Sequence, residues 1–355
     1  MKEVNNFPPQ YRPGSRVSTS PFSVGTTGPF AVTKKGDIVM VFTDHQARSG
    51  GHGSKIILEE RNLPPKNEIY SYDLSFRCKG IKETLPAVLK EPISPKKGMT
   101  LIKSGANTGV TEGSVLDPFF EYERKVSGKI IKSLGIKTQR MSEKGDSGGY
   151  SLTKETLQPI GIICAGDKNG KYSCHVSLEK IATKNKIKGF FAPITLPYNC
   201  SKELEFITSS IIPDGFFYQK TPFPQDESTI LKKLGVIGIH NDKKIGFQVE
   251  YRDLISCKSN YLNNPKGDIG SFFTSEKGII GLEIGGNTNV TWIIKISKIL
   301  DAFNLSLFQG FSKKALAAIH LAGYWRTRCL HCSAIGPPGG ICKFCNSPIP
   351  EETTV

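Results

Sequence analysis

One serine in this sequence stands in a setting suited to nucleophilic chemistry, within Gly145-Asp146-Ser147-Gly148-Gly149. A serine that attacks a carbonyl carbon needs an exposed hydroxyl and two backbone N–H groups aimed at the developing oxyanion. Glycines on both sides let the backbone turn tightly and approach a substrate closely. The run therefore predicts a nucleophile loop, provided that other parts of the chain supply a base and an acid.

The run resembles the nucleophile loop of chymotrypsin-like serine proteases, and two upstream segments resemble the partners that this family uses. The apolar stretch 38–45 ends in Thr-Asp-His and is similar to the strand that delivers the family's catalytic histidine. We favour His45 over His52, because His52 lies in a glycine-rich loop rather than directly after an apolar run. Asp73, followed by alternating apolar residues, is similar to the segment that supplies the family's acid; an ordinary strand-end carboxylate is the alternative.

The resemblance implies a role for each residue. The order His45, Asp73, Ser147 is that of the chymotrypsin type. Ser147 would be the nucleophile, His45 the general base and Asp73 the group that orients the imidazole. By the same resemblance, the backbone N–H groups of Gly145 and Ser147 would form the oxyanion hole.

Two more stretches fit the second barrel of this family. Residues 96–113 have the strand, turn, strand pattern of its start, and residues 160–166 form a continuous apolar run typical of a buried strand. The resemblance covers about residues 15–185, so we expect a two-barrel domain over 15–190. No cysteine stands directly after His45 and no Ile-Val-Gly-Gly start is present, so the chain resembles HtrA-like and viral proteases more than the secreted digestive enzymes.

The substrate pocket is less readable. By resemblance, Met141 falls near the base of the pocket, where an apolar residue argues against selection of arginine or lysine. Gly166 ends the strand that would form one pocket wall. His175 lies on the next strand, where relatives can use a histidine to hold a polar substrate side chain; an ordinary strand residue is an equally good interpretation.

An internal repeat follows the first domain. Three blocks recur in the same order: 144–151 in 266–273, 160–166 in 278–286, and 175–181 in 294–299. Matched blocks in order favour a duplication. Ile269 stands at the nucleophile position of the second copy, so we expect residues 196–310 to form a catalytically inactive, degenerate protease-like β module.

The C-terminal region carries two Cys-x-x-Cys pairs, formed by Cys329, Cys332, Cys342 and Cys345. Four thiolates on two tight turns are typical of a closed, tetrahedral structural zinc site. The competing interpretation is a pair of disulfides, which an oxidising compartment would favour.

A helix with a serine cap is predicted just before these cysteines, over 312–322. Residues 311–350 would then form a helix plus a zinc-ribbon-like unit. Most of the remaining chain consists of short apolar runs separated by Gly, Pro and Asn, which predicts an all-β protein with little helix.

Composition narrows the choice of partners. The chain has 355 residues and a net charge of +15, with lysine-rich runs at 129–137 and 180–188. Such a charge can mark affinity for nucleic acid, although a lysine-coated soluble surface is the simpler interpretation. No stretch is long and apolar enough to span a bilayer. No apolar signal segment is seen at the N-terminus, so we expect a reducing, cytoplasmic setting.

Two hypotheses result. The first is an intracellular serine endopeptidase acting on polypeptides, of viral or cellular origin. The second is a catalytically vestigial scaffold that binds nucleic acid or protein through its basic surface and zinc unit. The sequence leaves the oligomeric state open.

Overall fold

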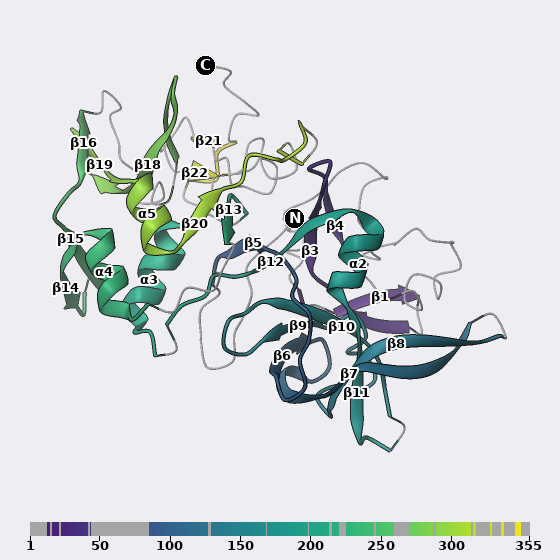
Figure 1. Ribbon diagram of the computed structural model, residues 1–355. Coiled ribbons are helices and arrows are strands. Elements are labelled where there is room, and N and C mark those ends of the chain that lie inside the picture. Colours follow the sequence, from purple (N-terminus) through teal and green to yellow (C-terminus); the bar gives the residue numbers. More distant parts are fainter. Residues whose placement is uncertain are drawn as a thin grey trace.

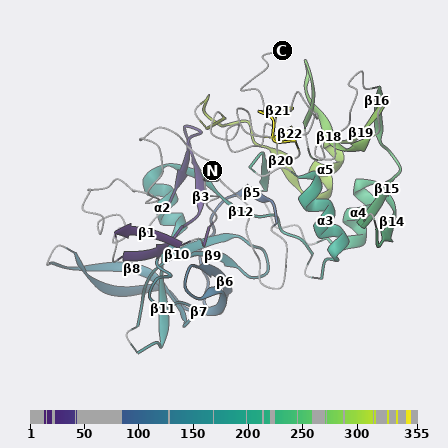
Figure 2. The ribbon, with the colours of Figure 1, turned by 180° about the vertical axis from the view of Figure 1, so that it is seen from behind.

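The computed structural model describes residues 13–14, 16–20, 23–41, 43, 85–126, 129–167, 169–197, 199–212, 215–219, 225–244, 246–258, 270, 272–286, 289–313, 315–316, 327–328, 335–336 and 345–348. These residues are mostly β-strand, which confirms the predicted fold class. A closed barrel and a second β unit with helices lie on either side of a central sheet, in both views (Figures 1 and 2).

The closed barrel carries the Ser147 loop. Its six strands are joined in the order β10-β11-β8-β7-β6-β9, and all neighbours are antiparallel. Leu101, Val115, Ile136 and Ile160 fill part of its interior. The strands are β6 (Thr100–Gly105), β7 (Gly109–Val126), β8 (Lys129–Gln139), β9 (Tyr150–Thr153), β10 (Pro159–Gly166) and β11 (Tyr172–Ser177). The β6–β7 hairpin and the buried start of β10 confirm the strands predicted within 96–113 and 160–166.

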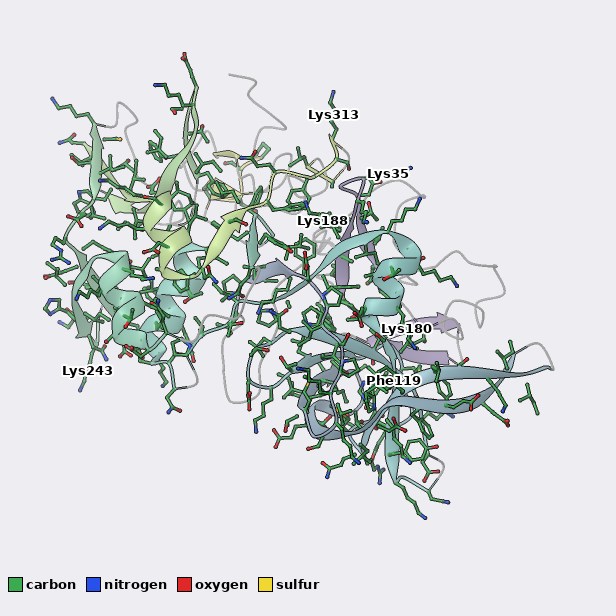
Figure 3. All side chains as sticks on the ribbon, in the orientation of Figure 1. Lys35, Phe119, Lys180, Lys188, Lys243 and Lys313 are labelled. Atoms are coloured by element: carbon green, nitrogen blue, oxygen red, sulfur yellow. The ribbon has the colours of Figure 1, made fainter. Side chains whose placement is uncertain are left out.

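Strands β7 and β8 continue past the barrel as a two-stranded ribbon. Phe119 on this ribbon is 69% exposed and Ile130 is 70% exposed (Figure 3). The other ends of these two strands belong to the barrel, where β8 pairs with β11.

The central sheet joins both halves of the chain. Its order is β20-β13-β5-β12-β3-β4. Four strands come from the region expected to be the protease domain, whereas β13 and β20 come from the region expected to be the second module. The pairing of β13 with β5 therefore makes one continuous sheet across that boundary. The strands are β3 (Phe30–Thr33), β4 (Ile38–Met40), β5 (Ala87–Lys90), β12 (Ile187–Pro193), β13 (Phe217–Gln219) and β20 (Leu305–Leu307). A separate hairpin, β1 (Arg16–Ser20) with β2 (Ser23–Thr26), precedes them.

The second half repeats the order of elements that follows Ser147. In what we call the first repeat, β9, β10 and β11 are followed by a helix and β12; in the second repeat, β17, β18 and β19 are followed by a helix and β20. The second repeat also contains β16 and the hairpin of β14 and β15. Their bounds are β14 (Val236–Asp242), β15 (Gly246–Tyr251), β16 (Ile255–Lys258), β17 (Phe272–Ser275), β18 (Gly278–Gly286) and β19 (Val290–Lys295).

The helices of the structure include several that the sequence analysis did not predict. Strand β11 ends at Ser177, whose hydroxyl accepts a hydrogen bond from the N–H of Lys180 and caps helix α2 (Leu178–Asn185). Helices α3 (Lys202–Ile211) and α4 (Glu227–Leu234) begin with similar side-chain caps. Helix α5 (Ile296–Ala302) lacks such a cap. Helix α3 packs Leu204, Ile207 and Ile211, spaced as one helical face, into the core of the second half.

The C-terminal region is described in short pieces. The Ser312 hydroxyl accepts a hydrogen bond from the N–H of Ala315 and so caps the start of the predicted helix, whose residues 317–322 lie outside the described part. Strands β21 (Thr327–Arg328) and β22 (Ile335–Gly336) pair with each other. Among the described residues, no helix is long and apolar enough to cross a membrane.

Candidate active site

Ser147 lies in the loop between β8 and β9 and is half-buried. Gly145 and Gly148, on either side of it, have φ angles of +104° and +91°, which side-chain-bearing residues rarely adopt. The loop is attached to β10, because the N–H of Gly148 donates to the Ile163 carbonyl at 2.7 Å and the N–H of Ile163 donates to the Gly149 carbonyl at 2.9 Å. The glycines that the sequence pattern singled out are therefore those the backbone requires.

A second set of bonds holds the loop from the N-terminal side. The Thr26 N–H donates to the Ser147 carbonyl at 2.8 Å, and the Thr26 hydroxyl donates to the Gly145 carbonyl at 2.8 Å. With both carbonyls engaged, the Gly145–Asp146 and Ser147–Gly148 peptide planes are fixed. The N–H of Gly145 donates to no acceptor within the described part of the chain, so it is available to an incoming oxyanion.

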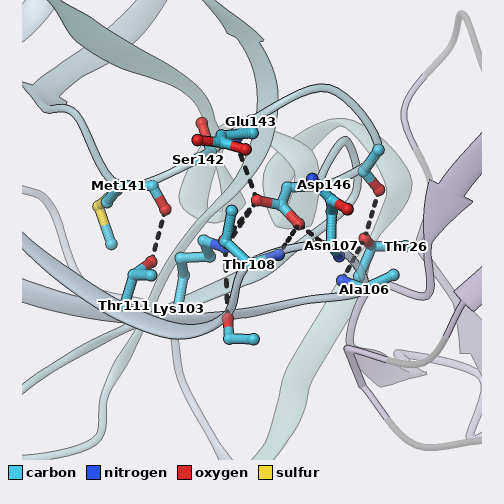
Figure 4. A network of polar contacts seen from close by, with 12 residues as sticks. Thr26, Lys103, Ala106, Asn107, Thr108, Thr111, Met141, Ser142, Glu143 and Asp146 are labelled. Atoms are coloured by element: carbon cyan, nitrogen blue, oxygen red, sulfur yellow. Dashed lines mark hydrogen bonds and ion pairs between the residues drawn. The ribbon is translucent and has the colours of Figure 1, made fainter. Parts of the chain in front are cut away.

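The deepest anchor of the loop is an ion pair between Asp146 and Lys103 (Figure 4). Both side chains are fully buried, with 2.9 Å between Lys103 Nζ and Asp146 Oδ2. The carboxylate also accepts hydrogen bonds from the Thr108 hydroxyl at 2.6 Å and from the N–H groups of Asn107, Thr108 and Glu143 at 2.9, 3.1 and 3.0 Å. A buried charge that is paired and fully hydrogen-bonded in this way fixes its own position and that of the backbone carrying it.

The electrostatics of the pair follow from this environment. Burial tends to raise the pKa of Asp146, but the hydrogen bonds from Thr108, Glu143 and Lys103 outweigh it and hold the pKa below its usual value. Burial lowers the pKa of Lys103, against the hydrogen bond and charge of Asp146, which raise it. Gly105 makes the pairing possible, because a Cβ there would lie 2.5 Å from Asp146 Oδ1 and 2.6 Å from Lys103 Nζ.

A cavity of about 590 Å³ opens beside Ser147. One wall is the loop 140–147 and the other is formed by the end of β10 and the start of β11, including Ala165, Gly166 and Tyr172. Arg140 and Glu143 on the loop form an ion pair at 2.8 Å. The walls of the cavity therefore contain both polar and apolar residues, and the cavity begins at Ser147, the candidate nucleophile.

Of the residues predicted to form the substrate pocket, Gly166 and Met141 lie in different surroundings. Gly166 lines the cavity. The Met141 side chain is 3% exposed and packs into the barrel core beside Leu101 and Ile160. Its neighbour Ser142, which the sequence analysis did not single out, lines the cavity and shares a 2.7 Å hydrogen bond with the Ser173 hydroxyl.

His175 is fully buried inside the barrel rather than among the residues that line the cavity. Its Nε2 lies 3.0 Å from the Thr138 hydroxyl and its Nδ1 lies 2.9 Å from the Ser151 hydroxyl. Burial, with the nearby charge of Lys103, lowers the pKa of His175 to about 3. The ring is therefore neutral at physiological pH and ties three strands together.

The predicted base and acid, His45 and Asp73, lie outside the described residues. The chain that leads to His45 does approach the loop. A Cβ on Gly28 would lie 2.1 Å from the carbonyl oxygen of Val41 and 3.2 Å from that of Gly148. Residue 41, four positions before His45, and the residue after the nucleophile thus both pack against Gly28.

Of the four predicted metal ligands, Cys329, Cys332 and Cys342 lie outside the described residues, and Cys345 is half-buried. Within the described part, no three His, Cys, Asp or Glu side chains are grouped as a metal site would require. Strands β21 and β22 are joined by residues 329–334, which include the first Cys-x-x-Cys pair.

No family model and no curated protein sequence matches this chain. Among solved structures, it is similar to the Nocardiopsis protease NAPase (16% identical, TM-score 0.39, 51% of this chain and 99% of that one). It is also similar to protease A of Thermobifida fusca (13%, 0.39, 51% and 98%). A third is a glutamic acid-specific serine protease that uses a histidine triad in substrate binding (17%, 0.35, 50% and 98%). Each match spans nearly the whole of the solved protein and about half of this chain.

Proposed function

We propose that this protein is a serine endopeptidase that cleaves polypeptides through an acyl-enzyme on Ser147. The observation that carries the proposal is the environment of this serine. It lies between two positive-φ glycines, at the edge of a cavity of about 590 Å³, on a loop fixed by the buried Asp146–Lys103 pair. A plain β-turn needs neither the buried ion pair nor the cavity.

The proposed reaction uses this geometry in two steps. His45 takes the proton of Ser147 Oγ as the oxygen attacks the scissile carbonyl carbon, and the N–H groups of Gly145 and Ser147 stabilise the oxyanion. The intermediate then expels the amine, which leaves with the proton from His45. In the second step water attacks the acyl carbon while His45 takes its proton; the bond to Ser147 Oγ then breaks, His45 returns the proton to that oxygen, and the carboxylic acid is released. Asp73 orients His45 throughout.

The support for His45 is positional. The apolar strand β4 and Val41 bring the chain to Gly28, which packs against Gly148. Four further residues lead to His45. For a substrate, the end of β10 offers the cavity wall beside Ser147, with Gly166 admitting a close backbone approach.

The test is labelling with a fluorophosphonate, which reacts with activated serines. Wild-type protein should be labelled and Ser147→Ala should not, whereas Ser94→Ala should be labelled like wild type because the exposed Ser94 hydroxyl only contacts Glu179. His45→Ala should lose labelling and His52→Ala should keep it. If folded wild-type protein is not labelled, the alternative of a catalytically vestigial binding scaffold is the better assignment.

We also propose a structural zinc ion held by Cys329, Cys332, Cys342 and Cys345, in a reducing, intracellular setting. A thiolate donor set of four closes a tetrahedral site and leaves no open position, so the ion would contribute to folding and not to peptide cleavage. The pairing of β21 with β22 across the first cysteine pair supports a compact knuckle. Metal analysis should find about one zinc per chain, lost in Cys329→Ser; two disulfides without zinc would contradict the proposal.

The second repeat is proposed to be a degenerate copy of the protease region that has lost its chemistry. Its nucleophile position, Ile269, lies outside the described residues, but an isoleucine carries no group that can attack a carbonyl. The strand order and helix position of the first repeat are kept, which supports a common origin.

A further inference from the structure

A cluster of exposed lysines lies on the side of the molecule where the β3–β4 turn, the end of α2 and the start of the C-terminal segment meet (Figure 3). We call it the lysine face. Each of its side chains is exposed. Its members are Lys34, Lys35, Lys184, Lys186, Lys188 and Lys313.

The three segments of the lysine face are bound to one another. The N–H of Lys34 donates to the Lys186 carbonyl at 2.7 Å, which joins the turn to the end of α2. The N–H of Ser312 donates to the Gly36 carbonyl at 2.9 Å, which joins the turn to the residue before Lys313. A Cβ on Gly36 would lie 2.1 Å from the Gly310 carbonyl oxygen. These lysines therefore form one surface held by backbone contacts, although they are far apart in sequence.

Little negative charge offsets this surface. None of the six lysines forms an ion pair within the described part of the chain. On the three segments, residues 33–38, 178–189 and 310–316, the acidic residues are Asp37 and Glu179. Asp37 accepts a hydrogen bond from the Ser312 hydroxyl at 2.7 Å, and Glu179 accepts one from the Ser94 hydroxyl at 2.6 Å. Concentrated like charge destabilises a folded protein through self-repulsion, so it calls for an anionic partner.

The chemistry of the face favours a polyphosphate over a lipid bilayer. A protein segment that binds a membrane surface usually combines basic residues with exposed apolar side chains that insert. Only one of the large apolar side chains that are exposed in the described part, Leu316 at 40%, lies on these three segments; several others lie on the β7–β8 ribbon instead. Lysine ammonium groups act on phosphates as flexible point charges, without the paired geometry that reads bases.

We propose that the lysine face binds nucleic acid through its phosphate backbone, without sequence preference. The segment that begins with Lys313 of this face is also basic, since residues 311–350 contain five Lys or Arg and no acidic residue. The proposal is independent of the peptidase activity, because none of the six lysines lines the cavity beside Ser147.

The experiment measures binding of a fluorescent single-stranded RNA oligonucleotide by anisotropy, over a series of salt concentrations. If about five phosphates are contacted, affinity should fall on the order of a hundredfold for a fourfold increase in salt. The variant Lys35→Glu/Lys186→Glu should weaken binding at least about tenfold and reduce the slope against log salt by about one to two. All variants should retain fluorophosphonate labelling of Ser147, which reports an intact fold.

The matched control is Lys243→Glu/Lys244→Glu, which makes the same change in net charge. These exposed lysines lie on the β14–β15 turn, far from the lysine face (Figure 3), and the control should bind RNA within about twofold of wild type. Equal losses in both variants would show that overall charge, not this surface, attracts RNA. Binding to phosphatidylserine vesicles with no binding to RNA or to DNA of the same sequence would overturn the proposal in favour of a membrane surface.

Discussion

The two repeats share the pairing of their hairpin strands but differ in barrel closure and in their buried side chains. Strand β10 pairs with β11 with a register shift between Ile163 and Ala165, and β18 pairs with β19 with a shift between Glu283 and Gly285, at the same place in the hairpin. The N–H of Gly148 donates to the Ile163 carbonyl in the first repeat, and the N–H of Gly270 donates to the Glu283 carbonyl in the second, both at 2.7 Å. Their φ angles are +91° and +88°.

The barrel differs more than the hairpins. By register, β14, β15 and β16 correspond to β6, β7 and the end of β8. In the first repeat these strands close a six-stranded barrel, whereas the second forms a four-stranded sheet and a separate hairpin. Residues from α3, α4 and α5, such as Leu204, Ile230 and Ile299, fill the core of this second unit. The apolar faces of α3 and α4, which precede the strands of this unit, thus contribute to its core where the first repeat has a closed barrel.

The buried polar network around His175 has no counterpart among the described residues of the second repeat. The Thr138–His175–Ser151 network occupies positions that correspond, by strand register, to Cys257, Ile293 and Phe273. The position of Lys103, counted from the closing pair of the hairpin, is held by His240, which is exposed and paired with Glu250. The paired hairpins of the second repeat therefore form without these polar groups, whereas in the first repeat Lys103 holds Asp146 of the Ser147 loop.

The largest effect should come from removing the buried ammonium. Lys103→Met leaves the Asp146 carboxylate buried and without its counter-ion, which should destabilise the protein by about 3–5 kcal/mol and strongly reduce fluorophosphonate labelling of Ser147. The matched change in the second repeat, His240→Met, removes an exposed group and should alter stability by no more than about 0.5 kcal/mol. Urea denaturation and labelling of both variants measure the difference. Equal effects would contradict the idea that the ion pair serves the Ser147 loop.

A second test uses the buried imidazole. The pKa of His175 is lowered to about 3 from an ordinary value of 6.5, so between these values the unfolded chain binds a proton that the folded chain does not. Stability should fall as pH drops from 6.5 toward 3, by at most about 1.4 kcal/mol per pH unit from this residue. Asp146, whose pKa is held below 3.8, adds its loss only below that value.

His175→Ile introduces the residue of the second repeat and should flatten this pH dependence above pH 4, even though the loss of hydrogen bonds to Thr138 and Ser151 lowers stability at neutral pH. Urea midpoints measured from pH 4 to 7 give the slopes. A slope that persists in His175→Ile would assign the acid sensitivity to other groups.

Part of the fold and of the candidate site could be predicted from the sequence. The Gly-Asp-Ser-Gly-Gly run and the three repeated blocks were readable because glycines and apolar runs report backbone conformation directly. The Lys103 position was overlooked because a lysine in a strand is usually exposed. The alternation of Leu101, Lys103 and Gly105, all buried on one face of β6, was the available signal.

Other features depend on long-range packing, which short sequence patterns do not encode. Helices α3 and α4 have capping residues, Ser201 and Asp226, but the surrounding β-rich pattern concealed them. The pairing of β13 with β5 joins three-residue and four-residue strands over a hundred residues apart. Likewise, Met141 and Ser142 are adjacent in sequence, and only the path of the loop after β8 decides which one faces the cavity.

A smaller loss of stability is expected from substituting the two corresponding glycines, Gly148 and Gly270. Gly148→Ala and Gly270→Ala each place a Cβ on a left-handed backbone, which should cost about 1–2 kcal/mol. The two changes should therefore lower the thermal midpoint to a similar degree, but only Gly148→Ala should also slow fluorophosphonate labelling of Ser147. Loss of labelling in Gly270→Ala would mean that the second repeat supports the first site directly.

The smallest expected effect is the most informative about the second repeat. Ser147→Ala/Ile269→Ser restores a serine at the corresponding position, yet the double variant should remain unlabelled. A hydroxyl alone is a weak nucleophile without an adjacent base, and the second repeat has neither a closed barrel nor a buried cation in place of Lys103 among its described residues. Single Ile269→Ser should be labelled only to the extent of wild type, at Ser147. Labelling at residue 269, located by peptide mass spectrometry, would show that the second repeat still assembles a catalytic site and that the loss of one side chain, not of the framework, made it inactive.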